Sequence, residues 1–231
     1  MKKLTEFQLA QSLDQTNLNP FLTYDEYVLF FEESRNLNFS SVAILPIYTQ
    51  LAAKILNGSH TIVDAAISYP LGCVPAILKA KEVEHAVKFG AGEIDYVVNI
   101  AAIKSGSYKK VFDEAQMIIS AANGKPVKAI IEMWNLSEEE VRATCEELIA
   151  AHVTYIKSST AYKGYKNMRE GTIDDALLLK KVVHNRAKVK IAGGIRDIDQ
   201  VVKLLDLGVD RIGSSSGVRI LDGFRRFYQN N

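Results

Sequence analysis

The sequence contains little cysteine and no long apolar run, and both absences narrow the class of protein. Cys73 and Cys145 are its two cysteines among 231 residues, and they form no C-x-x-C pair. Neither a disulfide framework nor a thiolate metal site is therefore predicted. No segment approaches the ~20 consecutive apolar residues of a membrane span. The basic first three residues are followed by polar ones and not by the apolar stretch of a secretory signal. We therefore expect a cytoplasmic protein.

An excess of charge of either sign is also missing. Lys and Arg number 28 and Asp and Glu number 27, which gives a formal net charge of +1. A protein that binds nucleic acid or an anionic membrane normally carries a basic patch, so we expect neither partner. An anionic ligand must be small and held locally. The four histidines are scattered singly and offer no ligand cluster, so we expect no metal and no cofactor.

What the chain does contain is an alternation of short apolar runs with longer segments of helical period. The runs are rich in Val, Ile and Ala, and they predict strands at 11–14, 41–45, 61–67, 93–98, 127–132, 153–157, 188–192 and 209–212. Helices between them are predicted to start at the caps Thr23 and Ser137 and to stop at Gly58, Gly90 and Gly208.

Eight strand-helix units in one chain of this length predict an α/β fold, a single (β/α)8 TIM barrel over residues 1–231. The average is about 29 residues per unit, which suits the roughly 250 residues of a closed barrel. An open doubly wound sheet is the main alternative. Such a sheet normally carries a glycine-rich nucleotide loop after its first strand, where this chain has DQTNLNP. No linker divides the chain, so we expect one domain.

The predicted strands place charged residues on the face that should point into the barrel. Side chains alternate along a strand, and the polar faces comprise Ser12, Asp14 and Thr16, then Glu93 and Asp95, Lys128 and Glu132, Lys157, and Lys188 and Lys190. Barrel interiors are normally filled by Val, Ile and Leu. A buried charge without partners costs several kcal/mol, so these groups must pair with one another or contact water. They form either a structural ion-pair network or a reaction site.

Four of these residues favour a reaction site. Asp14, Asp95, Lys157 and Lys190 are expected near C-terminal strand ends, where barrels of this kind carry their sites. A lysine amine with the ordinary pKa of about 10.4 is protonated at neutral pH and cannot attack a carbonyl. Burial and a second nearby ammonium group both lower that pKa. Lys157 beside Lys190 therefore fits the requirement of Schiff-base chemistry.

Glycine-rich turns follow the last two strands. They read GGIRD at 193–197 and GSSSG at 213–217, and each precedes a helix. Loops after strands seven and eight form the common phosphate site of these barrels, because backbone N–H groups at a helix N-terminus point at the anion. Either turn alone could be only a tight turn, but the pair predicts phosphate binding. Gly194, Ser214 and Ser215 are the strongest candidates.

Six blocks of sequence, in this order, closely resemble the deoxyribose-phosphate aldolase family: LDQT, GAGEIDYVVN, AIIE, YIKSST, KIAGGIRD and DRIGSSSG. The blocks extend over nearly the whole chain. The resemblance implies a class I aldolase, a lyase of deoxyribonucleoside catabolism. Its reaction would reversibly cleave 2-deoxy-D-ribose 5-phosphate to acetaldehyde and D-glyceraldehyde 3-phosphate. It also implies a homo-oligomer, with a homodimer favoured.

The resemblance assigns roles to single residues. Lys157 would be the Schiff-base lysine, Lys190 the neighbouring cation and Asp95 the proton-transfer carboxylate. Together with the loop analysis, it gives these expected substrate-binding residues: Asp14, Thr16, Thr160, Gly193, Gly194, Gly213, Ser214 and Ser215. Tyr228 is expected to pack in a last helix; its alternative role is that of a proton relay.

The chain departs from the common family pattern at three places. Ala161 stands where many members have glycine, and an alanine would be strained there if the position requires a positive φ. Ala43 replaces a frequent cysteine, and SYPLG replaces G-F-P-x-G. The last two changes do not touch the expected chemistry. Two alternatives stay open: another class I aldolase of phosphosugars, and an inactive barrel that binds a phosphosugar.

Overall fold

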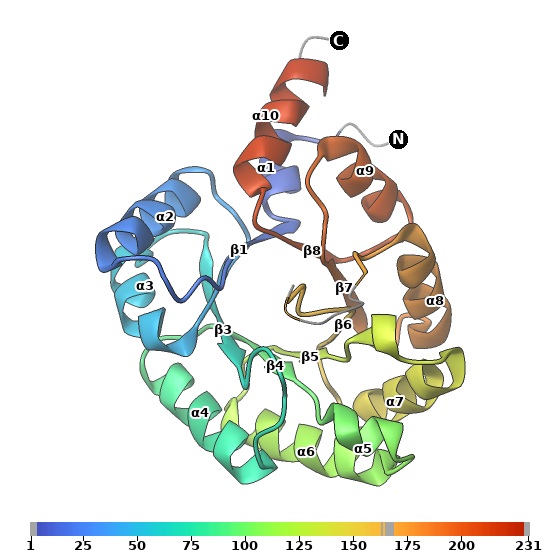
Figure 1. Cartoon of the computed structure of the whole chain (residues 1–231). Helices are drawn as coiled ribbons and strands as arrows, with labels where there is room; N and C mark the ends of the chain where they lie inside the picture. The colour runs from blue at the N-terminus through green and yellow to red at the C-terminus, as the bar shows by residue number, and fades with distance from the viewer. Residues whose placement is uncertain (1–3, 163, 165–168, 229–231) are drawn as a thin grey trace.

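Figure 1 shows the computed structural model of the chain, which describes residues 4–162, 164 and 169–228. Eight strands form a closed barrel in sequence order, with β1 paired to both β2 and β8. All eight strand pairs are parallel. The helices surround the barrel as an outer ring (Figure 1). The predicted (β/α)8 barrel is therefore confirmed.

The strands are β1 (Leu13–Asn17), β2 (Ser41–Ile44), β3 (Ile62–Ile67), β4 (Glu93–Val97), β5 (Val127–Ile130), β6 (Tyr155–Lys157), β7 (Lys188–Ala192) and β8 (Arg211–Ser214). The α-helices are α1 (Glu6–Ala10), α2 (Tyr24–Asn36), α3 (Thr49–Ile55), α4 (Ala76–Lys88), α5 (Ile100–Lys104), α6 (Tyr108–Ala121), α7 (Glu138–Ala150), α8 (Ile173–Val183), α9 (Ile198–Asp206) and α10 (Gly217–Tyr228). Two short 3-10 helices are η1 (Pro46–Tyr48) and η2 (Met133–Asn135). The side chain of Tyr228 lies outside the described part of the structure.

The predicted helix signals act as expected. Thr23 caps α2 and Ser137 caps α7, and each side chain accepts the N–H of the third helical residue. That residue is Glu26 in one helix and Glu140 in the other, and its side chain accepts the cap N–H in return. Two otherwise unpaired donors are satisfied at each end in this way. The predicted stop glycines all adopt positive φ just beyond α3, α4 and α9: Gly58, Gly90 and Gly208.

The first and last strands begin two residues later than predicted. Gln11 caps the short helix α1, so β1 starts at Leu13 and not at residue 11. Val209 donates its N–H to the Leu204 carbonyl and still belongs to the end of α9, so β8 starts at Arg211. In both cases the turn that closes a helix uses residues that alternation alone assigns to a strand.

The main apolar core lies between the strands and the helices and not inside the barrel. On β4, the side chains of Ile94 and Tyr96 belong to this outer core. Asp95, Lys128 and Lys190 are fully buried and face the opposite side, where they form ion pairs. The predicted sorting of apolar and charged faces is therefore confirmed. The interior of the barrel is a charged core, which places reactive side chains beneath the mouth formed by the strand ends.

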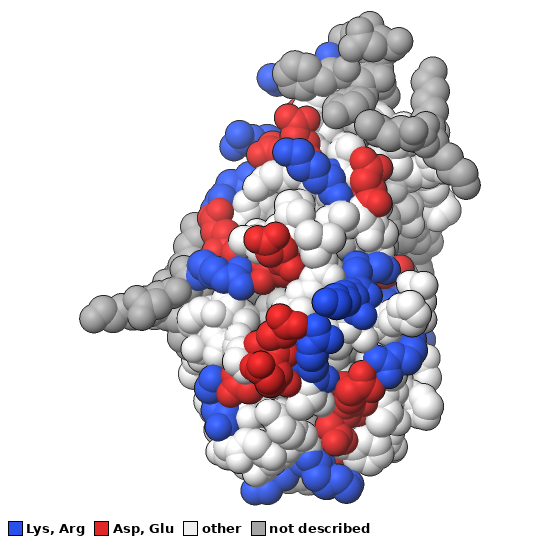
Figure 2. Space-filling view, turned by 90° about the vertical axis from the view of Figure 1, so that its right-hand side faces the viewer, with Lys and Arg blue, Asp and Glu red and all other residues white. Residues whose placement is uncertain are grey.

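The surface of the molecule mixes both charges. Figure 2 shows the side on which α8 and α9 lie, and basic and acidic residues alternate among the described residues of this face. No helix of the described residues has the length and apolar character needed to cross a membrane.

Candidate active site

Lys157 lies at the end of β6, where it joins the buried charges to an open cavity. The side chain is nearly completely buried, yet it lines a cavity of about 970 Å³ at the ends of β1, β6, β7 and β8. Of the eight charged residues that pair inside the described barrel, Lys157 alone lines this cavity. A ligand in the cavity can therefore reach the Lys157 amine.

Asp95 joins Lys157 to Lys190. Its Oδ2 atom lies 2.5 Å from Lys157 Nζ and 2.8 Å from Lys190 Nζ. Lys190 also contacts Asp14 Oδ2 at 2.6 Å. One carboxylate oxygen is thus shared between two amino groups, which brings the two lysines together without a direct contact between them.

The two lysines titrate in opposite directions because their partners differ. Burial lowers the pKa of Lys157, and the ammonium of Lys190 lowers it further, while Asp95 opposes the shift. Burial would also lower the pKa of Lys190, but Asp14 and Asp95 outweigh it and raise that pKa above its usual value. Burial would raise the pKa of Asp95, but Lys128, Lys157 and Lys190 hold it well below its usual value. Lys157 is the lysine that gives up its proton most readily.

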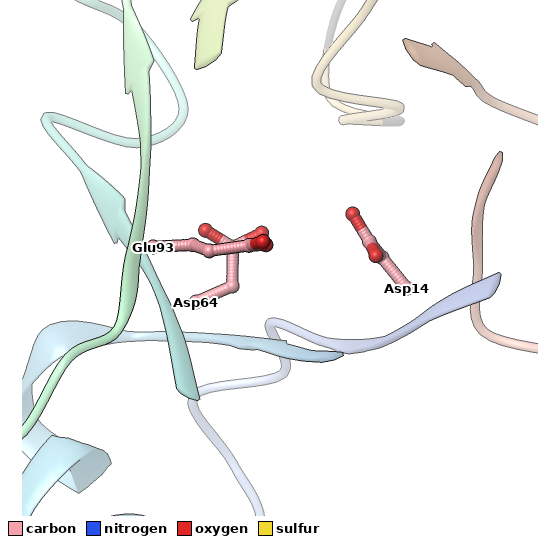
Figure 3. A group of neighbouring side chains, drawn as sticks. All are labelled: Asp14, Asp64 and Glu93. Atoms are coloured by element: carbon pink, nitrogen blue, oxygen red, sulfur yellow. The ribbon is translucent and has the colours of Figure 1, made fainter. Parts of the chain in front are cut away.

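A second layer of charges lies around Lys128, on β5. Its Nζ is 2.5 Å from Asp64 Oδ2, 2.6 Å from Glu93 Oε2 and 3.6 Å from Asp14 Oδ2. In Figure 3, Asp64 and Glu93 lie together on one side of the interior and Asp14 points in from another strand. Oxygen atoms of these three carboxylates lie within 4.8 Å of one another, as in a metal site. Here, however, the ammonium of Lys128 lies among them and balances their charge.

Arg211, on β8, completes the network. It pairs with Asp14 Oδ1 at 2.5 Å and with Glu93 Oε1 at 3.1 Å. Burial would lower its pKa, but these two carboxylates raise it further above the usual value. Asp14 is fully buried beneath the cavity, so its contacts assign it to the support of Lys190 and Arg211. Every strand except β2 now contributes a charged side chain to the interior.

The predicted site residues fall into two layers. Eight of them line the cavity: Thr16, Lys157, Thr160, Gly193, Gly194, Gly213, Ser214 and Ser215. The other three lie beneath it and are fully buried: Asp14, Asp95 and Lys190. Only Lys157 is the last residue of its strand, whereas Asp14 is the second residue of β1. The expectation that all four charged residues lie near strand ends is therefore wrong, because strands in a tilted barrel are staggered and place middle residues at the centre.

The loop after Lys157 is held by side chains from neighbouring strands. The hydroxyl of Ser158 accepts the Ala192 N–H at 3.1 Å. The Thr160 N–H donates to Glu132 Oε1, and Glu132 itself adopts φ 51° directly after β5. Ala161 has φ 60°, so the expected positive φ at this position is confirmed for an alanine. These contacts fix the cavity wall next to the reactive amine.

The glycine-rich turns lie on the other side of the cavity. Gly193 and Gly194 adopt φ 104° and 77°. Ser214 donates its hydroxyl to the Ile195 carbonyl at 2.6 Å and so ties the two turns together. Ser215 is exposed and lines the cavity. The free hydroxyl-bearing wall at the start of α10 is therefore where a phosphate group is best accommodated.

The N-terminus of α9 is less suited to bind phosphate. Asp197 caps this helix by accepting the Gln200 N–H at 2.9 Å, so a carboxylate already lies there. Arg196 donates to the Gly194 carbonyl at 3.0 Å and pairs with Glu170. The expectation of two equivalent helix ends is thus replaced by one favoured end, that of α10.

Sequence reasoning did not single out Asp64 or Arg211. Asp64 is the one charged residue in the apolar run TIVDAAI, and Arg211 opens the block RIGSSSG. A charged residue within a predicted barrel strand was the available signal for both. Glu132 was placed on the inner face, but its contact with the loop after Lys157 depends on a left-handed backbone that no pattern announces.

Comparison with known proteins identifies the family. No protein-family model matches the chain. The deoxyribose-phosphate aldolase of Carboxydothermus hydrogenoformans is 36% identical over 220 residues, which cover 94% of this chain and 95% of that protein. The deoxyribose-phosphate aldolase of Halalkalibacterium halodurans is 38% identical over 219 residues, covering 94% and 96% of the two chains.

Solved structures agree with these relatives. An aldolase called QR15 superposes with a TM-score of 0.90 at 32% identity, covering 96% of this chain and 98% of that one. The tetrameric deoxyribose phosphate aldolase of Aeropyrum pernix gives a TM-score of 0.87 at 25% identity, covering 96% and 92%. Sequence and fold agree over nearly the full length of both chains, and the chain belongs to the deoxyribose-phosphate aldolase family.

Proposed function

We propose that the protein is a class I aldolase that reversibly cleaves 2-deoxy-D-ribose 5-phosphate to acetaldehyde and D-glyceraldehyde 3-phosphate. One observation carries the proposal. The amine of Lys157 is buried, has a lowered pKa, lines the cavity and contacts a carboxylate at 2.5 Å. An amine in that setting can attack an aldehyde at neutral pH. The family of the chain supplies the substrate.

The chemistry begins at Lys157 Nζ. The neutral amine adds to the C1 aldehyde of the open-chain sugar, and loss of water leaves a protonated imine. The C2–C3 bond then breaks as the C3 hydroxyl loses its proton. The bonding electrons move into the imine and form an enamine, and glyceraldehyde 3-phosphate leaves. A proton adds to C2, and water hydrolyses the imine to release acetaldehyde and the free amine.

Asp95 is placed to move protons at the reacting nitrogen. Its Oδ2 atom is 2.5 Å from Lys157 Nζ, so it can accept a proton from the amine and return one during loss of water. Lys190 does not line the cavity; it is a positioning residue that holds Asp95 ionised from below. Thr16, Thr160, Gly193 and Gly213 line the cavity and are proposed to contact the substrate.

The phosphate is proposed to bind at the start of α10, with Ser214, Ser215 and Gly194 around it. Ser215 offers an exposed hydroxyl, and helix N-termini carry about half a positive charge. The positive φ of Gly194 leaves its backbone without a side chain at the cavity wall. This places the phosphate across the cavity from the amine.

Reductive trapping tests the function. The protein is incubated with 2-deoxy-D-ribose 5-phosphate and borohydride, and the modified peptide is identified by mass spectrometry. The adduct is expected on Lys157. Lys157→Ala should lose both the adduct and turnover with unchanged circular dichroism, and Lys157→Arg should do the same because a guanidinium stays protonated. Lys188→Ala, at the exposed start of β7, is the matched control and should react normally.

The same experiment separates the alternatives. An adduct on another lysine would contradict the assignment of Lys157. Trapping with other phosphosugars but not with the deoxypentose phosphate would indicate a different class I aldolase. Binding without any adduct would indicate an inactive barrel.

We further propose that the protein is a cytoplasmic homodimer. The Aeropyrum pernix relative is described as tetrameric, and Phe21 and Ile47 are strongly exposed apolar side chains that an interface could cover. Both cysteines are free thiols, as expected in a reducing compartment. Light scattering of the purified protein tests the oligomeric state, and the mass of a monomer would contradict it.

A further inference from the structure

Asp64 is the least well paired carboxylate in the barrel. It lies on β3, and its Oδ2 atom contacts Lys128 Nζ at 2.5 Å and Lys190 Nζ at 3.2 Å. Its Oδ1 atom is buried and has no hydrogen-bond partner among the described residues. Its register partner on β2 is Ala43, whose methyl group offers no hydrogen bond. Only one oxygen of Asp64 is therefore compensated.

The other interior carboxylates have cations at both oxygens. Asp14 contacts Arg211 through Oδ1 and Lys190 through Oδ2. Glu93 contacts Arg211 through Oε1 and Lys128 through Oε2. Asp95 is likewise paired at both oxygens. Since a carboxylate is stabilised by the cations around it, Asp64 is the interior acid that most readily takes up a proton.

The charged groups around Asp64 all belong to barrel strands. They are Asp14 from β1, Glu93 and Asp95 from β4, Lys128 from β5, Lys157 from β6, Lys190 from β7 and Arg211 from β8. With Asp64 they make four basic and four acidic groups. The interior is neutral if all eight are ionised. It carries one excess negative charge if Lys157 alone becomes neutral.

We propose that Asp64 is a positioning residue of the reaction, which holds a proton when Lys157 is the free amine and so keeps the charged interior neutral. The inference rests on the proposed function, since a free amine at Lys157 matters only for imine formation. The proton that the Lys157 ammonium loses is matched by an O–H bond on Asp64. The two forms contain the same number of protons and the same net charge.

The titration of Asp64 agrees with this role. Burial and the neighbouring Asp95 raise the pKa of Asp64 to about 7. An ionised Asp64 also favours the protonated form of Lys157. The two groups therefore compete for one proton near neutral pH, and the formation of free amine is spread over a wide pH range.

The pH dependence of borohydride trapping at Lys157 tests the proposal. Asp64→Asn keeps the size of the side chain and mimics its protonated form. Removing the competing charge should shift the midpoint of trapping toward lower pH by on the order of one unit and make the transition steeper. Glu114→Gln, a buried acid paired with Lys79 between α4 and α6, is the matched control and should leave the midpoint unchanged.

A second measurement does not depend on the variant being active. Infrared difference spectra of the wild-type protein against Asp64→Asn should show the carbonyl band of a carboxylic acid below pH 7 that disappears above it. Absence of that band at pH 6, or an Asp64→Asn midpoint equal to that of the wild type, would overturn the role of Asp64. No adduct on Lys157 in the wild type would instead refute the proposed function, so the two failures are distinguishable.

Discussion

Lys157 and Lys190 are register partners on adjacent strands, yet their amino groups meet only through one oxygen atom of a shared carboxylate. The arrangement gives them different tasks. Lys190 contacts Asp14, Asp64 and Asp95 and keeps its charge. Lys157 has only the shared oxygen and the cavity, and burial lowers its pKa. The reactivity of Lys157 therefore depends on the cation below it.

Substitution of that cation should raise the pKa of Lys157. In Lys190→Met the ammonium of Lys157 no longer faces a like charge, so its proton is held more tightly. Turnover at pH 7 should fall by about 10² to 10⁴ and recover in part at higher pH. The pH profile of kcat/KM checks this. Loss of activity without any alkaline recovery would show that Lys190 acts in another way.

Asp95→Asn should separate imine formation from turnover. The amide keeps the shape of the side chain but cannot exchange a proton with Lys157 Nζ. Substrate should still bind and trapping on Lys157 should persist, because removal of the carboxylate leaves the amine with less reason to hold its proton. Turnover should fall by about 10² to 10⁴. A large loss of affinity for inorganic phosphate in this variant would contradict the role.

The sequence was sufficient for the barrel because two periodicities agreed along its whole length. The inner faces of β4 to β7 followed from alternation alone, and so did the meeting of Asp95, Lys128, Lys157 and Lys190. Alternation is a local rule, so it sorts side chains into inside and outside correctly once a strand is recognised.

The same rule cannot give the depth of a residue in the barrel. Strand stagger placed Asp14 beneath the cavity, although its position before Thr16 suggested a substrate contact. Asp64 and Arg211 became visible only when their partners, 29 to 197 residues away in sequence, came within ion-pair distance. Pairing of distant charges is a property of the closed sheet and not of any single segment.

The phosphate site can be tested at Ser215. Ser215→Ala removes an exposed hydroxyl at the cavity wall and should raise KM for the phosphorylated sugar severalfold, with little effect on unphosphorylated 2-deoxyribose. Equal losses for both sugars would show that the loop shapes the cavity and does not bind phosphate. Gly194→Val is a poorer test, because a Cβ atom at Gly194 would lie within contact of the Glu170 carboxyl and the backbone φ is 77°.

Ser214→Ala is the informative companion to Ser215→Ala. The Ser214 hydroxyl donates to the Ile195 carbonyl and accepts the Ser216 N–H, so it holds the two turns together. Its removal should therefore weaken both substrates and lower the melting temperature, whereas Ser215→Ala should change neither the melting temperature nor the reaction of the unphosphorylated sugar.

The free energy of unfolding should carry the signature of Asp64. Its pKa is about 7 in the folded protein and about 3.8 as an ordinary carboxyl. Between these values the unfolded chain has released the proton and the folded chain retains it. The wild-type protein should therefore lose stability as the pH rises from about 4 to about 7, by on the order of 4 kcal/mol if Asp64 alone is counted.

Comparison with Asp64→Asn isolates this contribution. Asp14 and Asp95 have lowered pKa values, so their contributions are fully present above about pH 4 and are lost only in stronger acid. Urea unfolding of both proteins at pH 5 and pH 8 measures the difference. The variant should gain stability relative to the wild type at pH 8, where Asp64 is a buried, half-paired charge, and the gap should narrow at pH 5. Two curves that run parallel across this range would show that Asp64 is ionised throughout and that its single paired oxygen is sufficient to hold the charge.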